Sequence, residues 1–373
     1  MRDSDSSILC LHQGAELYGS DRSFLAAVEA LAGAGATLDV ILPADGELAA
    51  EVRKVKGASL AFYSKGILRK RELKQPLVFA FNMLAGWLFY LQRFARHPVV
   101  YINTVVMFSA LFAACFYRFS SKRIICHVRE IPSGWQLLVF RTLFLLSSVE
   151  LVFNSKATQA AFRLPGRVIY NGVEQVTQSV EVQPRSLSGR PIHLLMIGRI
   201  NEWKGQFFLV EALGLLPNEV LSRLQVRIVG SPFEGYEYLA DDLQDKVEQA
   251  GLSDAVTLLS FCQDPTEHYA WSDYVVVPST LPEPFGRVAI EAFSFARPVI
   301  AAGHGGLTEI VEQGRSGFLF APADQAALVQ QICVLAGFTD AEYASLCRGA
   351  HERFLQHFSI DGYRASLRAL FSI

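Results

Sequence analysis

Residues 274–306 read YVVVPSTLPEPFGRVAIEAFSFARPVIAAGHGG, and this stretch decides the expected fold. A β-branched apolar run leads into a proline-bearing turn, a helical pattern begins near Arg287, and a second apolar run starts at Pro298. Strand, helix and strand in this order are typical of a parallel sheet covered by helices. The turn carries two carboxylates, Glu283 and Glu291, eight positions apart. We therefore expect both acids near the carboxyl edge of a sheet, where ligands bind in such folds.

The same alternation runs along most of the chain. Candidate strands occupy twelve short runs: 7–13, 37–43, 98–104, 123–128, 149–155, 167–172, 192–200, 224–230, 255–261, 274–279, 298–304 and 317–322. Residues 175–191 interrupt the pattern with polar sequence that contains Ser and Pro, which is typical of a linker. The sequence therefore predicts an α/β protein with two Rossmann-like, doubly wound domains facing a cleft.

Composition excludes several classes of protein. Of the 373 residues, 51% are hydrophobic and 19% are charged, which excludes a disordered chain. Residues 1–185 hold 21 Lys and Arg against 14 Asp and Glu, a net charge of +7, whereas the remainder carries −9. No nucleic-acid recognition motif accompanies the basic half, so nucleic acid is not an expected partner. The six cysteines stand singly and the acidic N-terminus does not resemble a signal peptide, so we expect a cytoplasmic protein.

Two apolar stretches, 76–94 and 98–117, are long enough to be membrane spans. The second divides into a strand and a helix, and the first reads as a buried helix, so the pattern favours buried helices over spans. The segment 64–75 contains five basic residues: Lys65, Arg69, Lys70, Arg71 and Lys74. A solvated loop and attraction to anionic lipid head groups both explain this run.

Two cations follow the strand that begins at 192 and ends in Gly198. Arg199 and Lys204 lie in MIGRINEWKGQ (196–206), in the loop before the next helix. Arg and Lys at five-residue spacing suit a diphosphate, although loop cations that merely face water remain the alternative. Gly230 ends the next strand, where a glycine permits close approach of the backbone to a ligand.

The two carboxylates of the opening stretch suit a polyol. Glu291 lies in the first turns of a helix and can accept hydrogen bonds from paired ribose hydroxyls. Glu283 precedes that helix and can accept from a hexose, and the free N–H groups of the helix start attract anions. A pair of surface acids beside a turn is the alternative. Together with Arg199 and Lys204, the residues predict a nucleotide-sugar site.

At this point the chain resembles a known family, the retaining glycosyltransferases with the GT-B fold, and family four in particular. The resemblance covers most of residues 150–322 and is carried by four motifs in order: VIYNGVE (168–174), GRINEWKG (198–205), EPFGRVAIE (283–291) and GGLTEIVEQGRSGFLF (305–320). It implies an acceptor-side domain (1–178), a linker (179–191), a nucleotide-sugar-binding domain (192–355) and a C-terminal helix (356–373) that crosses back to the first domain.

The resemblance also implies roles for individual residues. Arg199 and Lys204 would contact the donor diphosphate, and Glu291 would contact ribose. The transferred sugar would be contacted by Glu283, Phe285 and Gly286. Further donor contacts are expected at Gly230, Arg287 and the backbone near Ser260, Phe261 and Cys262.

The N-terminal half matches the family less closely. Relatives have a double glycine in the first loop, where this chain has Gly19 and Ser20, which we expect beside the donor phosphate or the acceptor. The segment ICHVREI (125–131) resembles the family's strand that ends in a histidine, which implies a catalytic His127 near the sugar. Arg129 and Glu130 are weaker candidates.

The expected function is transfer of a hexose from a nucleotide sugar, first a UDP-sugar and second a GDP-sugar, to a lipid-linked or growing polysaccharide, with retention of configuration. We expect no metal or other cofactor, because the family that the chain resembles looks metal-free and we find no DxD-like motif that would hold Mg²⁺ between carboxylates. We expect a peripheral enzyme at the inner face of an anionic membrane. A GT-B nucleotide-sugar epimerase and a binding-only GT-B protein are the alternatives.

Overall fold

The computed structural model describes residues 7–69, 72, 74–175 and 185–372. The chain divides into two compact units. Unit 1 comprises Met1–Gly172 with Ile360–Ile373, and unit 2 comprises Val173–Ser359. Each unit contains one sheet in which every strand pairing is parallel. The α/β prediction with two doubly wound domains is therefore confirmed.

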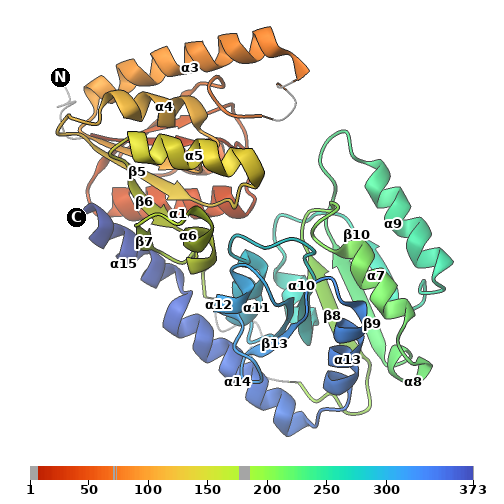
Figure 1. Cartoon of the computed structure of the whole chain (residues 1–373). Coiled ribbons are helices and arrows are strands. Elements are labelled where there is room, and N and C mark those ends of the chain that lie inside the picture. Colours follow the sequence, from red (N-terminus) through yellow and green to blue (C-terminus); the bar gives the residue numbers. More distant parts are fainter. Residues whose placement is uncertain (1–6, 70–71, 73, 176–184, 373) are drawn as a thin grey trace. The chain divides into compact units, whose positions relative to one another are not determined.

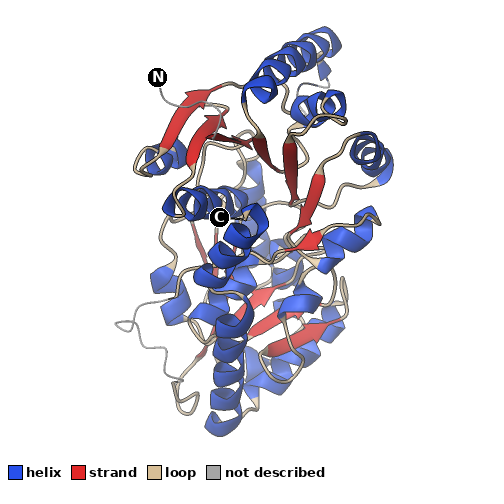
Figure 2. Ribbon diagram, turned by 90° about the vertical axis from the view of Figure 1, so that its left-hand side faces the viewer, coloured by secondary structure: helices blue, strands red, loops and turns tan. Residues whose placement is uncertain are grey.

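The sheet of unit 1 has the strand order β3-β2-β1-β4-β5-β6-β7. Its strands are β1 (Ser7–His12), β2 (Thr37–Leu42), β3 (Ala58–Phe62), β4 (Val99–Asn103), β5 (Arg123–Val128), β6 (Glu150–Phe153) and β7 (Arg167–Val168). The helices are α1 (Gly19–Gly33), α2 (Glu47–Val52), α3 (Pro76–Arg96), α4 (Phe108–Phe116), α5 (Gly134–Leu146), α6 (Lys156–Phe162) and α15 (Ile360–Phe371). Helices α3, α4 and α5 cover one face of the sheet, and α1 and α15 cover the other (Figures 1 and 2).

The sheet of unit 2 has the order β10-β9-β8-β11-β12-β13. Its strands are β8 (Ile192–Ile197), β9 (Leu224–Val229), β10 (Val256–Leu259), β11 (Tyr274–Val277), β12 (Val299–Ala302) and β13 (Gly317–Phe320). The helices are α7 (Gln206–Gly214), α8 (Asn218–Leu221), α9 (Tyr238–Gln249), α10 (Thr266–Trp271), α11 (Arg287–Ser294), α12 (Leu307–Ile310), α13 (Gln325–Ala336) and α14 (Asp340–His357). The strand order reverses between β8 and β11, and such a switch point is where doubly wound sheets bind ligands.

The sequence predicts a buried helix at 76–94, and the prediction of burial is wrong. The segment is helical, as α3, and is long and apolar enough to cross a membrane, but only 17% of its most apolar window is buried. One narrow stripe (Gly86, Tyr90 and Phe94) packs inward against α4, the sheet and the segment 63–66, and the remaining described side chains of α3 are half-buried or exposed. The second stretch divides into β4 and α4, as expected.

Two predicted segments fall partly outside the described residues. Of the basic run, Lys70 and Arg71 lie outside them, as do residues 176–184 of the expected linker. At the other end of the chain, α15 is amphipathic and belongs to unit 1. Its buried face (Ile360, Tyr363, Leu367 and Leu370) joins the core beneath α1, and the Tyr363 hydroxyl donates to the Ser23 carbonyl over 3.1 Å.

Candidate functional site

The turn between β11 and α11 is shaped by close backbone packing. Gly286 has φ +114°, and a side chain there would collide with Leu307 Cδ2, so only glycine fits where α11 begins. The Gly306 N–H donates to the Glu283 carbonyl over 2.8 Å, which ties the turn to the loop after β12. Phe285 is buried beneath the turn. The short segment before α11 therefore holds Glu283 in one fixed position.

Glu283 is buried and paired with Lys204. Its Oε1 accepts from Lys204 Nζ over 2.6 Å and from the Ser279 hydroxyl over 2.7 Å. The Glu283 side chain is 6% exposed and that of Lys204 is 24% exposed, so the cation reaches solvent while the carboxylate does not. Two predicted site residues, from loops 79 positions apart, are thus brought into direct contact.

Glu291 is held by two donors. Its Oε1 accepts from Arg287 Nε over 2.7 Å, and its Oε2 accepts from the Tyr269 hydroxyl over 2.9 Å. Tyr269 lies on α10, is 1% exposed, and stacks on Phe295 with ring centroids 5.2 Å apart. The sequence pattern did not identify Tyr269, because its contact with Glu291 joins two helices and leaves no local motif.

Arg199 and Gly230 lie at neighbouring strand ends. The guanidinium carbon of Arg199 lies 3.9 Å from the ring centroid of Phe233, so the guanidinium stacks on this half-exposed ring. At Gly230, with φ +159°, a Cβ would collide with the Gly198 carbonyl, so the ends of β8 and β9 approach too closely for a side chain. The segment expected to read the base continues from β10, where the Phe261 N–H donates to Ser231 Oγ over 3.0 Å. Phe261 is 40% exposed and Cys262 is half-buried.

In unit 1, Gly19 and Ser20 form the first turn of α1. The next residue, Asp21, is buried, and its carboxylate contacts His12 Nε2 at 2.6 Å and accepts from the Tyr18 N–H at 2.9 Å. The buried His12–Asp21 pair was not predicted, since the two residues belong to different elements. The described side chains therefore place a carboxylate at this helix start, directly beside the two residues expected to approach phosphate.

His127 is fully buried, in contrast to the expected position near a sugar. Alternation along β5 turns its side chain toward the face covered by α1 and α15, where its Nδ1 accepts from the Tyr101 hydroxyl (2.9 Å) and from Arg129 Nη2 (3.2 Å). Burial and the nearby Arg129 charge hold the pKa of the His127 imidazole well below 6.5. The geometry favours a role inside unit 1, and the catalytic role stays a prediction.

The two weaker candidates extend this polar core. Arg129 is buried and donates to Asn103 Oδ1 over 2.5 Å, to Asn171 Oδ1 over 2.6 Å and to the Tyr363 hydroxyl over 3.0 Å. Burial raises the pKa of the Glu130 carboxyl, whose Oε2 accepts from the backbone N–H of Arg129 over 3.3 Å. This network joins β4, β5 and α15, and its neutral oxygen acceptors satisfy the buried guanidinium.

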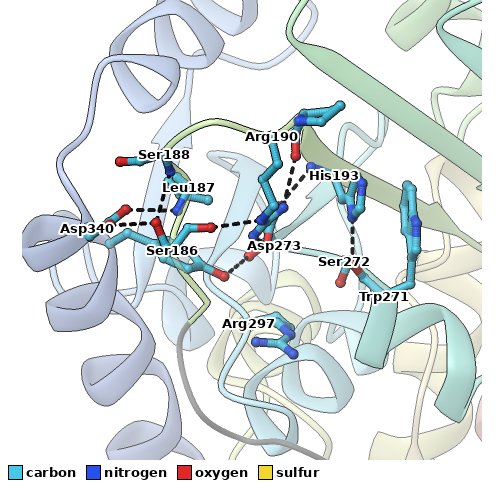
Figure 3. Close-up of polar contacts among 12 residues, drawn as sticks. Ser186, Leu187, Ser188, Arg190, His193, Trp271, Ser272, Asp273, Arg297 and Asp340 are labelled. Atoms are coloured by element: carbon cyan, nitrogen blue, oxygen red, sulfur yellow. Dashed lines mark hydrogen bonds and ion pairs between the residues drawn. The ribbon is translucent and has the colours of Figure 1, made fainter.

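A second polar cluster lies at the opposite edge of the unit 2 sheet, where β8 and β11 begin (Figure 3). Asp273 is fully buried, and its two oxygens accept from Arg190 over 2.7 Å each and from the His193 N–H over 2.9 Å. Asp340 accepts from Ser186 Oγ over 2.7 Å. These contacts fasten the described end of the linker segment to unit 2, away from the predicted donor-binding residues at the carboxyl edge.

Metal ligands do not gather in the described part of the chain. Within residues 7–69, 72, 74–175 and 185–372, no group of three or more His, Cys, Asp and Glu side chains has the spacing needed to hold a metal ion. The independence from metals that the sequence predicts stays a prediction for experiment.

Comparison with known proteins identifies the family that the chain resembles. Residues 180–335 match the family described as glycosyl transferases group 1. D-inositol 3-phosphate glycosyltransferase of Paenarthrobacter aurescens (strain TC1) is 38% identical over 150 residues, which are 38% of this chain and 36% of that protein. The protein of the same name from Corynebacterium urealyticum is 30% identical over 241 residues, 61% of this chain and 56% of the relative. The chain thus spans about a third to somewhat over half of these curated relatives.

Solved structures extend the likeness to almost the whole chain. Anabaena HepE in complex with UDP and glucose has a TM-score of 0.78 and 24% identity, and the match covers 98% of this chain and 99% of that one. Sucrose-phosphate synthase from Thermosynechococcus elongatus has a TM-score of 0.77 and 20% identity, with 98% of both chains covered. Identities this low show the fold alone, and that fold is GT-B, as the sequence predicted.

Proposed function

We propose that this chain, which resembles the group 1 glycosyltransferases and has the GT-B fold, moves a hexose from a nucleotide sugar to a lipid-linked or growing polysaccharide acceptor. The observation that carries the proposal is the contact between Lys204 and Glu283, at the same sheet edge as the pair Arg287–Glu291. Cations suit the diphosphate and carboxylates suit the sugar hydroxyls.

The pairing of Lys204 with Glu283 suggests how the donor is bound. A buried ion pair that loses one partner is costly, so donor binding should exchange the partners rather than separate them. Lys204 would turn to the leaving phosphate, and Glu283 would accept from hydroxyls of the transferred hexose. Arg199, which stacks on Phe233, would supply a second charge to the diphosphate. Charge that is oriented before the reaction stabilises a leaving diphosphate as it develops.

Retention of configuration belongs to the proposal. Glu283, the one carboxylate proposed to reach the hexose, would be engaged by hydroxyls of the sugar and by the Ser279 hydroxyl, which donates to its Oε1 over 2.7 Å, and this makes it a poor nucleophile. The departing phosphate would instead accept the proton of the attacking hydroxyl on the same face of the sugar. No metal is required in this scheme, because Arg199 and Lys204 supply the positive charge.

A UDP-sugar is the first donor to test and a GDP-sugar the second. Anabaena HepE, which shares the fold, was solved in complex with UDP, and this supports the order. The experiment measures nucleotide release and sugar conversion against UDP-, GDP- and ADP-sugars, with and without membrane extract as acceptor source. Acceptor-dependent release from one donor supports transfer. Sugar interconversion without acceptor would indicate an epimerase, and tight binding without release would indicate a binding protein.

A phosphorylated polyol is a second candidate acceptor. The curated relatives from both organisms carry the name D-inositol 3-phosphate glycosyltransferase, which favours a small, soluble sugar-phosphate acceptor. Labelled product separates the two acceptors, because a lipid-linked product moves into an organic phase and a polyol phosphate stays in water. For the lipid-linked acceptor, the enzyme would work at the inner face of the membrane, and the +7 charge of residues 1–185 supports attraction to anionic lipid.

A further inference from the structure

The outer surface of α3 presents an uncovered apolar stripe. Leu77, Phe81, Leu84 and Leu88 recur at helical spacing along one side of this helix, and they are 85%, 60%, 53% and 49% exposed. Large apolar side chains are usually scattered singly over a soluble surface, whereas a contiguous row marks an interaction site. The stripe therefore needs a partner that covers it.

The stripe continues over the neighbouring helices. Trp87 of α3 contacts Phe112 and Phe116 of α4 with ring centroids 5.7 and 5.2 Å apart, and these two rings are 41% and 61% exposed. The outer side of α5 exposes Trp135, which is 64% accessible. Figures 1 and 2 show α3, α4 and α5 as one layer on the same face of the unit 1 sheet. We name the outer side of this layer the apolar face.

The segment that forms the apolar face is mostly basic. Residues 63–149 contain 12 Lys and Arg and 2 Asp and Glu; of these cations, Lys70 and Arg71 lie outside the described residues, and Arg129 is buried on the other side of the sheet. Two of the cations lie against exposed rings: Lys65 Nζ is 4.2 Å from the Phe81 centroid, and the Arg118 guanidinium carbon is 5.6 Å from that of Phe119, which is 96% exposed. Exposed aromatic side chains with cations beside them suit a membrane interface. There the rings enter the acyl region and the cations contact the lipid head groups.

We propose that the apolar face docks on an anionic lipid membrane, with α3 lying in the interface and not crossing the bilayer. The inner side of α3 is committed to unit 1, since Tyr90 and Phe94 are fully buried and a Cβ on Gly86 would collide with the Gly66 backbone. A span would expose that core. A second copy of the chain is a poorer occupant, because two faces of the same strong positive charge repel each other. The purpose of docking, access to a lipid-linked acceptor, rests on the proposed function.

The test is sedimentation of the full chain with vesicles of phosphatidylcholine alone and of phosphatidylcholine mixed with phosphatidylglycerol. The variant carries Leu77→Ser, Phe81→Ser, Leu84→Ser and Leu88→Ser. Its matched control carries Leu215→Ser, Val334→Ser and Leu355→Ser, which are exposed apolar positions in unit 2. Wild type and control should bind the mixed vesicles, and the stripe variant should bind at least about tenfold more weakly. Trp135 emission should shift to the blue on binding, and Trp135→Phe should abolish most of that shift.

Several results would overturn the inference. These are equal binding by the stripe variant and the control, no vesicle binding by wild type, or a lipid-free dimer that the stripe variant abolishes. Titration with UDP keeps this failure separate from failure of the proposed function. Intact UDP binding and nucleotide release without vesicle binding refute only the docking. Vesicle binding without any nucleotide binding refutes the proposed glycosyl transfer and leaves the docking in place.

Discussion

Replacing Tyr269 by Phe tests whether donor binding by Glu291, the carboxylate proposed to hold ribose, depends on the buried Tyr269 hydroxyl. The substitution keeps the aromatic ring on Phe295 and removes the 2.9 Å hydrogen bond to Glu291 Oε2. A hydrogen bond to a charged group contributes about 1.5–3 kcal/mol. The Glu291 side chain is 22% exposed, so water can replace part of the lost bond and the lower end of this range applies. About 1.5 kcal/mol corresponds to roughly a tenfold loss of donor affinity.

The assay is steady-state kinetics with the preferred donor. Glu291 is proposed to hold ribose equally in the ground state and the transition state, so KM for the donor should rise about tenfold while kcat changes little. Tyr274→Phe is the matched control, because Tyr274 is equally buried and its hydroxyl has no partner among the residues that the structure describes. A correctly folded Tyr269→Phe enzyme whose KM stays within about twofold of wild type would refute the reasoning.

Three further predictions concern the site and the fold. Glu291→Ala should weaken donor binding by about 1.5–3 kcal/mol, since it removes the carboxylate proposed to accept from ribose, and unchanged affinity in calorimetry would remove Glu291 from the site. Activity should survive EDTA; a complete loss that Mg²⁺ or Mn²⁺ restores would reveal a metal site. Because the pKa of His127 is held well below 6.5 in the fold, the unfolded chain binds a proton there first, and stability should fall as pH drops below about 6.5. His127→Gln should reduce that slope in denaturant titrations, and an unchanged slope would contradict the assignment.

Local sequence pattern was a good guide to the strands and to the start of α11. Buried β-branched runs such as Tyr274–Val277 leave a signal within a few residues, and so does the glycine that starts α11. The strand Ala58–Phe62 was missed because it lies at the sheet edge with most of its side chains exposed, so it lacks that apolar signature.

Features set by tertiary neighbours could not be read in the same way. Hydropathy correctly marked 76–96 as apolar, but it carries no information about what covers a helix, and so the exposure of Phe81 was not foreseen. The direction of His127 depends on the face of the sheet to which its strand turns it. The contact of Tyr269 with Glu291 joins residues 22 positions apart on two helices, and only the folded chain brings them together.

The central claim is that Lys204 binds the diphosphate of the donor and Glu283 binds its hexose. Calorimetric titration of variants of both residues with UDP and a UDP-sugar tests this claim most directly. Lys204→Met should weaken binding of both ligands by at least about tenfold, because both contain the diphosphate. Glu283→Gln should leave UDP affinity within about threefold of wild type and should remove the additional affinity that the sugar provides. Unchanged binding of both ligands to both folded variants would contradict the account.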